Sequence, residues 1–203
     1  LYSYVFPLQT PTGNRDLQPA DAYKISTIED SPGRSWQLTC YKKGFETPKW
    51  PVGGVMYQIF PDRFNFSGEE KKLERTDFTR NKDWYATPVW QPNEHGEITN
   101  SAFFMGDLKG ITQKLDYLEH LGVSCIYLNP IGEAYSNHRY DTGDYETLDS
   151  VLGTEEDFVN LCKSAHKMGM KIILDGVFSH TGSDSIYFDK LNRFGTGAYH
   201  NPD

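Results

Sequence analysis

The chain has few cysteines, and their arrangement indicates no chemistry. Cys40, Cys125 and Cys162 are an odd number at spacings that match no zinc or redox motif. Cys125 falls in a predicted strand and Cys162 on an apolar helix face. We therefore interpret the cysteines as small core side chains in a reducing compartment.

The chain also lacks a long apolar run and an excess of positive charge. No apolar segment is long enough to span a bilayer. The net charge is −8 and no five like charges follow one another, which argues against nucleic acid or an anionic membrane as a partner. No charged-then-apolar leader opens the chain, but residue 1 already lies in a strand-like run, so we expect the true start upstream. We expect a cytoplasmic protein and leave secretion open.

The segment Lys171–His180 (KIILDGVFSH) has the most informative pattern of the chain. It opens with the apolar run Ile172–Leu174, which predicts a short strand buried on both faces. Asp175 ends the run and His180 follows five residues later. A carboxylate and an imidazole at the carboxyl end of a buried strand are costly to desolvate unless they are paired or used, so they are candidate functional residues.

A helix is predicted directly before this strand. Thr154 and Asp157 have the spacing of a shortened capping box, and apolar residues recur at helical spacing up to Met168. Gly169 stands at the position expected of the residue that ends the helix.

The same order of elements occurs earlier in the chain. Apolar residues spaced along Ile111–Leu121 predict another helix, Gly122 ends it, and Val123–Leu128 (VSCIYL) reads as a strand. A further strand, Val55–Phe60, precedes both units. Strands that alternate with helices indicate an α/β fold with a parallel sheet and right-handed crossovers.

Residues 1–49 have a different character. They contain short aromatic and β-branched runs separated by turn residues. The predicted strands are Tyr2–Phe6, Ala22–Ile25 and Trp36–Tyr41, with turns at Pro11–Asn14 and Ser31–Gly33 and a linker at Phe45–Gly54. We interpret them as the closing strands of an antiparallel β-sandwich whose earlier strands are missing, with aromatic side chains in its core; a role of these aromatics as sugar platforms is the alternative.

A long polar loop is predicted at about residues 61–107. Segments of this length within a compact domain are usually functional, and Trp84 and Trp90 give this one apolar side chains to pack. The charged cluster Glu69–Lys72 is interpreted as a solvated face.

Polar residues also follow the second strand, where Ser136–Tyr145 (SNHRYDTGDY) is rich in hydrogen-bonding side chains. Three interpretations compete for His138, Asp141, Asp175 and His180. A metal site fits the ligand types, but no HxH or HExxH spacing is present. A buried polar network explains some of the residues. A sugar pocket, in which Tyr140 stacks on a ring, uses all of them.

Several ordered motifs resemble the opening half of the α-amylase family of glycoside hydrolases. They are His138-x-Tyr140, Asp175–His180 (DGVFSH), Tyr57–Phe64 (YQIFPDRF) and Gly106–Ile111 (GDLKGI). The sandwich-like start is similar to the neopullulanase and cyclomaltodextrinase branch. The resemblance covers nearly the whole chain and is strongest from Gly53 onward.

The resemblance implies the first half of a (β/α)8 TIM barrel, preceded by the last strands of an antiparallel β-sandwich domain. Residues 1–49 would be the C-terminal part of a starch-binding-like sandwich plus linker, and residues 50–203 the N-terminal half of the catalytic barrel. His180 would hydrogen bond the hydroxyls of the sugar ring being cleaved, His138 would bond its primary hydroxyl, and Tyr140 would stack on it. Asp175 would line the same subsite, or mainly orient its neighbours.

The resemblance also implies that this sequence lacks the two catalytic carboxyl groups. A retaining glycosidase needs a carboxylate nucleophile and a carboxylic acid, and in the family these follow later strands than those found here. We therefore expect a fragment of a larger enzyme, without turnover of its own. Ser179 stands where the family commonly has a calcium-ligating Asn, and the loop after Phe64 lacks a calcium-binding pattern, so we expect no bound calcium and no required cofactor.

Three functions remain after this reasoning. The first is an α-1,4-glucan hydrolase or transglycosylase, with α-1,6 bonds also open, that acts on maltooligosaccharides, cyclodextrins or starch. The second is a non-catalytic glucan-binding or structural remnant. The third is an unrelated metal-dependent barrel hydrolase, which would need a transition metal on His138 and His180. A homodimer through the N-terminal sandwich of the full-length protein is a further expectation.

Overall fold

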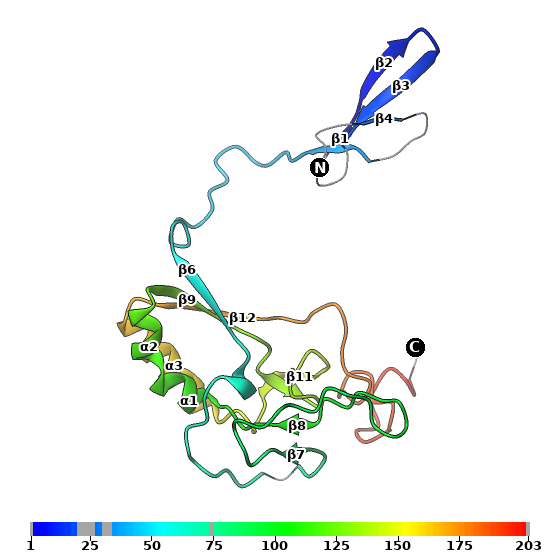
Figure 1. Ribbon diagram of the computed structural model, residues 1–203. Coiled ribbons are helices and arrows are strands. Elements are labelled where there is room, and N and C mark those ends of the chain that lie inside the picture. The colour runs from blue at the N-terminus through cyan, green and yellow to red at the C-terminus, as the bar shows by residue number, and fades with distance from the viewer. Residues whose placement is uncertain (1, 20–26, 30–33, 74, 202–203) are drawn as a thin grey trace. The chain divides into compact units, whose positions relative to one another are not determined.

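The computed structural model describes residues 2–19, 27–29, 34–73 and 75–201, and the chain divides into two compact units, Leu1–Pro48 and Lys49–Asp203. Figure 1 labels the helices and strands. No helix in the described part of the chain has the length and apolarity needed to cross a membrane.

The first unit is built from short antiparallel strands. They are β1 (Tyr2–Tyr4) paired with β5 (Trp36–Leu38), and β3 (Gly13–Gln18) paired with β2 (Phe6–Thr10) and β4 (Thr27–Glu29). The predicted run Tyr2–Phe6 is thus divided between β1 and β2, and the turn predicted at Pro11–Asn14 joins β2 to β3. The strand predicted at Ala22–Ile25 and the turn at Ser31–Gly33 lie outside the described residues.

The prediction that the aromatic residues of this unit form a core is wrong for the described part of it. The rings of Tyr4, Phe6 and Trp36 pack on one another with centroids 5.3–5.9 Å apart. Tyr4 and Phe6 nevertheless stay 42% and 52% exposed. The described strands form two small sheets, and the three rings, which come from both, pack on one another between them.

The second unit contains a parallel sheet of three strands in the order β12-β9-β6. The strands are β6 (Val55–Ile59), β9 (Val123–Leu128) and β12 (Lys171–Leu174). The parallel pairing and all three strand positions confirm the predicted alternation of strands and helices.

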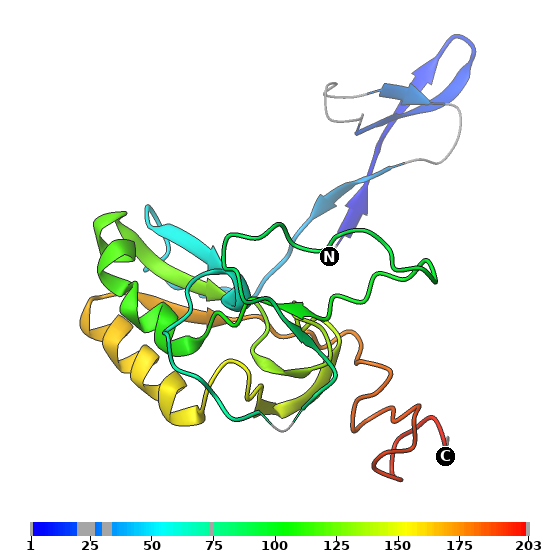
Figure 2. The same cartoon turned by 60° about the horizontal axis from the view of Figure 1, so that its bottom comes forward.

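Three helices lie together on one face of this sheet (Figures 1 and 2). They are α1 (Leu108–Gln113), α2 (Leu115–His120) and α3 (Glu155–Lys167). Apolar side chains from the helices and the helix-facing side of the strands form one buried cluster, which includes Ile59, Leu118, Ile126, Leu128 and Leu161. The burial of this apolar surface is the main stabilising contribution to the unit.

Helix α3 begins and ends as its sequence predicts. The Thr154 side chain accepts a hydrogen bond from the Asp157 amide, and the Asp157 carboxylate accepts from the Thr154 amide, which completes the capping box. Gly169 has a φ of +80°, the left-handed conformation expected just beyond a helix.

Two predicted elements differ from the structure. The strand Lys171–Leu174 is not buried on both faces, because β12 is an edge of the described sheet and Leu174 is 46% exposed. The single helix predicted over Ile111–Leu121 is broken at Lys114, whose amide donates to the Ile111 carbonyl. The Gly110 carbonyl, the ordinary partner of that amide, accepts a hydrogen bond from the side chain of Asn65 instead, at 3.1 Å.

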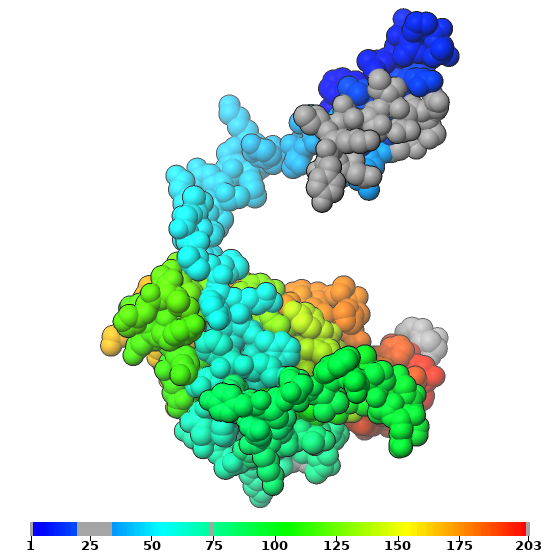
Figure 3. All heavy atoms as spheres, viewed as in Figure 1, coloured from blue at the N-terminus to red at the C-terminus, as the bar shows by residue number. Residues whose placement is uncertain are grey.

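The long segment between β6 and α1 contains short regular pieces. They are the 3₁₀ turn η1 (Pro61–Arg63) and the parallel pair β7 (Thr79–Arg80) and β8 (Ala102–Phe103). Figure 3 shows this segment, in cyan-green and green, spread over the lower part of the second unit. A hairpin of β10 (Gly132–Ala134) and β11 (Thr142–Leu148) follows β9.

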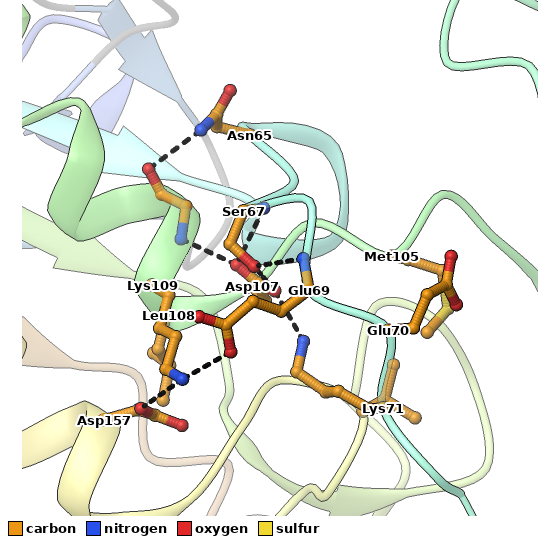
Figure 4. Close-up of polar contacts among 12 residues, drawn as sticks. Asn65, Ser67, Glu69, Glu70, Lys71, Met105, Asp107, Leu108, Lys109 and Asp157 are labelled. Carbon is orange, nitrogen blue, oxygen red and sulfur yellow. Dashed lines mark hydrogen bonds and ion pairs between the residues drawn. The ribbon is translucent and has the colours of Figure 1, made fainter.

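The start of the long segment is tied to α1 by a buried carboxylate (Figure 4). Asp107, which is fully buried, accepts from the Gly110 amide at 2.6 Å and from the Ser67 hydroxyl at 2.7 Å. The Lys71 ammonium lies 2.5 Å from the same carboxylate. The interpretation of Glu69–Lys72 as a solvated face is therefore wrong for Lys71, because its charge neutralises a carboxylate that has no access to water.

Candidate functional site

The candidate site lies where the three parallel strands end. The Asp175 amide continues the ladder beyond β12 by donating to the Leu128 carbonyl of β9 at 3.0 Å. Its carboxylate accepts a hydrogen bond from the Tyr140 hydroxyl at 2.8 Å. A cavity of about 390 Å³ lies beside this pair and is lined by Met56, Gln58, Tyr127, Tyr140 and Asp175.

Burial and the Asp175 carboxylate act on Tyr140 in the same direction. Desolvation, and next the hydrogen bond to Asp175, raise the pKa of Tyr140 to about 12. The phenol therefore stays neutral near pH 7 and holds the carboxylate by donating to it.

His180 joins this pair through the backbone. Its Nε2 lies 2.9 Å from the Tyr140 carbonyl oxygen, which can only accept a hydrogen bond, so Nε2 carries the proton. Its Nδ1 lies 3.1 Å from the Ser179 hydroxyl. The side chain is exposed to solvent, and it stands at the end of the segment that leaves β12.

His138 lies beside Tyr140, with ring centroids 5.9 Å apart. The Tyr140 amide donates to His138 Nδ1 at 3.1 Å, so in the neutral ring the proton is on Nε2. Desolvation lowers the pKa of His138, and the nearby Arg139 charge acts the same way against the opposing effect of Asp141. His138 is therefore a neutral donor through Nε2 near pH 7.

The Asp141 side chain does not join Tyr140, Asp175 and His180. Its carboxylate accepts from the Ser136 amide at 3.1 Å and also contacts the Ser136 hydroxyl. The structure thus brings Tyr140, Asp175 and His180 together, places His138 next to them, and turns Asp141 toward the hairpin loop.

Two residues at the floor of the site were missed from the sequence. Gln58 donates to the Asn129 side chain at 2.7 Å, which links the ends of β6 and β9. A polar glutamine inside the apolar run VMYQIF was a signal that could have identified the site-facing side of this strand.

The residues present do not fit a metal ion. No three His, Cys, Asp or Glu side chains within the described ranges are arranged to hold one, so the metal-hydrolase interpretation has no support. The Ser179 hydroxyl is taken up with His180, and in the loop after Phe64 the charge of Asp107 is already neutralised by Lys71. The expectation that no calcium is bound stays a prediction.

The arrangement suits a neutral, polyhydroxylated ligand. The cavity is lined by two phenols, an amide and one carboxylate, the imidazoles of His138 and His180 lie next to Tyr140, and no cation lines the cavity among the described residues. Such groups exchange hydrogen bonds with hydroxyls, while an aromatic ring offers an apolar face. A sheet of parallel strands with helices on one face has a β/α architecture, and in such folds ligands bind at the carboxyl edge of the strands, where these polar residues lie.

Comparison with known proteins identifies the family. The model of the α-amylase catalytic domain matches residues 58–201, and the chain belongs to that family. An amylopullulanase of Thermoanaerobacterium thermosulfurigenes is 48% identical over 188 residues, which is 86% of this chain and 10% of that protein. An intracellular maltogenic amylase of Bacillus subtilis is 45% identical over 151 residues, 74% of this chain and 23% of that protein.

A solved structure shows the same relationship. A cyclic α-maltosyl-(1→6)-maltose hydrolase from Arthrobacter globiformis, in complex with cyclic α-maltosyl-(1→6)-maltose, matches with a TM-score of 0.60 and 35% identity. The match covers 77% of this chain and 31% of that one. The family relationship implies a (β/α)8 barrel fold.

Proposed function

We propose that this chain supplies part of the substrate pocket of a glycoside hydrolase that acts on α-glucans. The observation that carries the proposal is the cluster of Tyr140, Asp175 and His180 at the carboxyl ends of parallel strands, beside a cavity that can admit a sugar ring. The names of the relatives, amylopullulanase and maltogenic amylase, agree with α-glucan substrates.

Within this pocket each residue has one role. The Tyr140 ring stacks on the sugar while its hydroxyl keeps Asp175 in place. His138 and His180 donate through Nε2 to sugar hydroxyls. For His180 this means exchanging its bond to the Tyr140 carbonyl for one to the ligand, and for His138 it means displacing the Asn100 side chain, whose Nδ2 lies 3.3 Å from Nε2. Asp175, which is held by Tyr140 and interacts with Tyr127 as well, accepts from a further hydroxyl of the sugar.

The bond is cleaved with retention of configuration, by groups outside the cavity described here. Retention needs two carboxyl groups about 5 Å apart, and the described lining of the cavity has one, Asp175. The nucleophile and the acid come from later strands of the barrel, and the chain alone has no turnover. Both α-1,4 and α-1,6 bonds are candidate targets, since the Arthrobacter enzyme is named for a substrate that contains a 1→6 link.

The remaining features of the whole protein are proposals of the same kind. Residues 50–203 form the N-terminal half of the barrel, supported by three consecutive parallel strands. Residues 1–49 are the end of a sandwich domain plus a linker, through which the full-length protein dimerises. The name of the intracellular amylase supports a cytoplasmic location. The protein needs no calcium, because Lys71 already neutralises the buried carboxylate of Asp107.

The test uses the intact gene product that carries this sequence. Maltooligosaccharides, cyclodextrins and pullulan are offered as substrates, and affinity for maltopentaose is measured by calorimetry. We expect hydrolysis, and a loss of affinity in His180→Ala. His166→Ala is the control, since His166 is an exposed histidine on α3. Binding without hydrolysis would favour the non-catalytic glucan-binding alternative, and no binding would refute the proposal.

A further inference from the structure

The residue between His138 and Tyr140 has an unusual conformation. Arg139 has a φ of +62°, in the left-handed region that residues other than glycine seldom adopt. It is also only 1% exposed, although arginine is rarely buried. A strained backbone and a buried charge at the same residue persist only where the surroundings hold both in place.

An ion pair holds the buried charge. Arg139 Nε donates to the Asp149 carboxylate at 2.6 Å, and Nη1 donates to the Asn137 carbonyl at 2.8 Å. Asp149 follows β11 and is itself 1% exposed. Its amide donates to the Ile131 carbonyl, and its other carboxylate oxygen accepts from the Val151 amide, so the anchor is fixed on both sides.

An aromatic ring and a second arginine complete the surroundings. The Arg139 guanidinium lies 5.5 Å from the centroid of the Phe103 ring, and Arg75 lies 5.3 Å from the same centroid. Arg75 also donates to the carbonyls of Ala134 and Tyr135 at 2.8 and 2.9 Å. The long segment and the hairpin therefore enclose Arg139 together. Arg139 Nη2 is the one buried side-chain nitrogen or oxygen without a hydrogen-bond partner in the described part of the chain.

The turn at Arg139 determines how its two neighbours face each other. The Arg139 amide donates to the Ser136 hydroxyl at 3.1 Å, and the next amide, that of Tyr140, donates to His138 Nδ1. His138 and Tyr140 thereby lie side by side, with their ring planes 33° apart. The hydrogen bond from the Tyr140 amide to Nδ1 also means that the neutral His138 ring carries its proton on Nε2.

We propose that Arg139 and Asp149 are a positioning pair: their buried ion pair holds the left-handed turn that sets His138 and Tyr140 side by side at the sugar pocket. The inference rests on the proposed function of these two residues. Neither member of the pair touches the sugar, so both act through the residues they hold.

The test compares variants of the intact protein by maltopentaose affinity, thermal unfolding and ¹⁵N NMR of the His138 ring. Arg139→Gly is the main variant, because glycine adopts a positive φ without strain and yet removes the guanidinium. We expect it to weaken binding about tenfold or more, since small displacements of positioned groups are costly. The ¹⁵N chemical shifts of the His138 ring nitrogens should also change, because the hydrogen bond from the Tyr140 amide to Nδ1 is disturbed. Asp149→Asn should show both effects. Because asparagine has nearly the size of aspartate, this variant still tests the inference if Arg139→Gly does not fold.

Lys71→Met is the matched control, because it breaks the ion pair of another buried carboxylate, Asp107, and neither residue lines the cavity. It should lower the unfolding temperature and leave both the affinity and the His138 spectrum unchanged. The inference is overturned if Arg139→Gly and Asp149→Asn bind maltopentaose as the unmodified protein does, or if Lys71→Met weakens binding equally. Failure of the unmodified protein to bind would instead refute the proposed function.

Discussion

The replacement Lys71→Met tests whether the Lys71 ammonium stabilises the second unit by neutralising the buried Asp107 carboxylate. The Lys71 side chain is 16% exposed and that of Asp107 is fully buried, with 2.5 Å between ammonium and carboxylate. Removing one partner of a buried pair costs about 3–5 kcal/mol, because the other charge stays buried without compensation.

The contacts that remain place the expected loss at the lower end of that range. Asp107 keeps its hydrogen bonds from the Gly110 amide and the Ser67 hydroxyl, both with good geometry. We therefore expect a loss of about 3 kcal/mol in the free energy of unfolding. For a protein of this size, that corresponds to a fall of roughly 6–12 °C in the unfolding temperature.

Calorimetric or circular dichroism melting measures this shift. Lys72→Met is the matched control, since Lys72 is exposed and its replacement should change stability by less than about 0.5 kcal/mol. The double variant Lys71→Met/Asp107→Asn should recover part of the loss, because Asn carries no charge and still caps a helix. The reasoning is wrong if Lys71→Met melts no lower than Lys72→Met, or if calcium raises the unfolding temperature of the unmodified protein.

Further predictions follow from the site and from α3. Tyr140→Phe removes the hydrogen bond to Asp175 and should lower the free energy of unfolding by about 1.5 kcal/mol. Ultraviolet titration of the unmodified protein should show one phenol that ionises near pH 12, and this variant should lack it. The lowered pKa of His138 means that the unfolded chain binds the proton more readily; its contribution to stability is full above about pH 6.5 and is lost as the pH falls through the lowered value. Urea unfolding between about pH 7 and pH 5 should therefore show a smaller slope with pH in His138→Asn, and an equal slope would contradict this. Thr154→Ala breaks the capping box with Asp157 and should cost about 1 kcal/mol in urea unfolding; no change would mean that the cap contributes nothing.

Local sequence patterns predicted the elements whose causes are local. The capping box at Thr154 and the left-handed glycine at Gly169 define α3, and both depend on residues within a few positions of one another. The three parallel strands follow from short apolar runs, since strands covered by helices carry such runs.

The differences arise from contacts between distant parts of the chain. Helix α1 ends early because Asn65, 45 residues before Gly110, takes the carbonyl that would have continued it. Lys71 reads as a surface lysine because its partner Asp107 lies 36 residues away. No helical or strand period reports such pairs, so only the folded chain shows them.

The sequence predicted which residues lie at the candidate site better than it predicted how they are arranged. The sequence placed His138, Tyr140, Asp175 and His180 in one site; the structure brings the last three together with His138 beside them, and their role in sugar binding stays a prediction. The pattern placed Asp141 with them, whereas in the structure it turns to Ser136. Side-chain direction within a loop depends on backbone turns such as the one at Arg139, which the sequence does not indicate.

A crystal structure of the intact protein with a bound maltooligosaccharide tests the central claim most directly. The account predicts a glucosyl ring stacked on Tyr140, with ring hydroxyls within hydrogen-bond distance of His138 Nε2 and His180 Nε2. A sugar bound elsewhere, with the cavity beside Tyr140 and Asp175 empty, would contradict the assignment of this site.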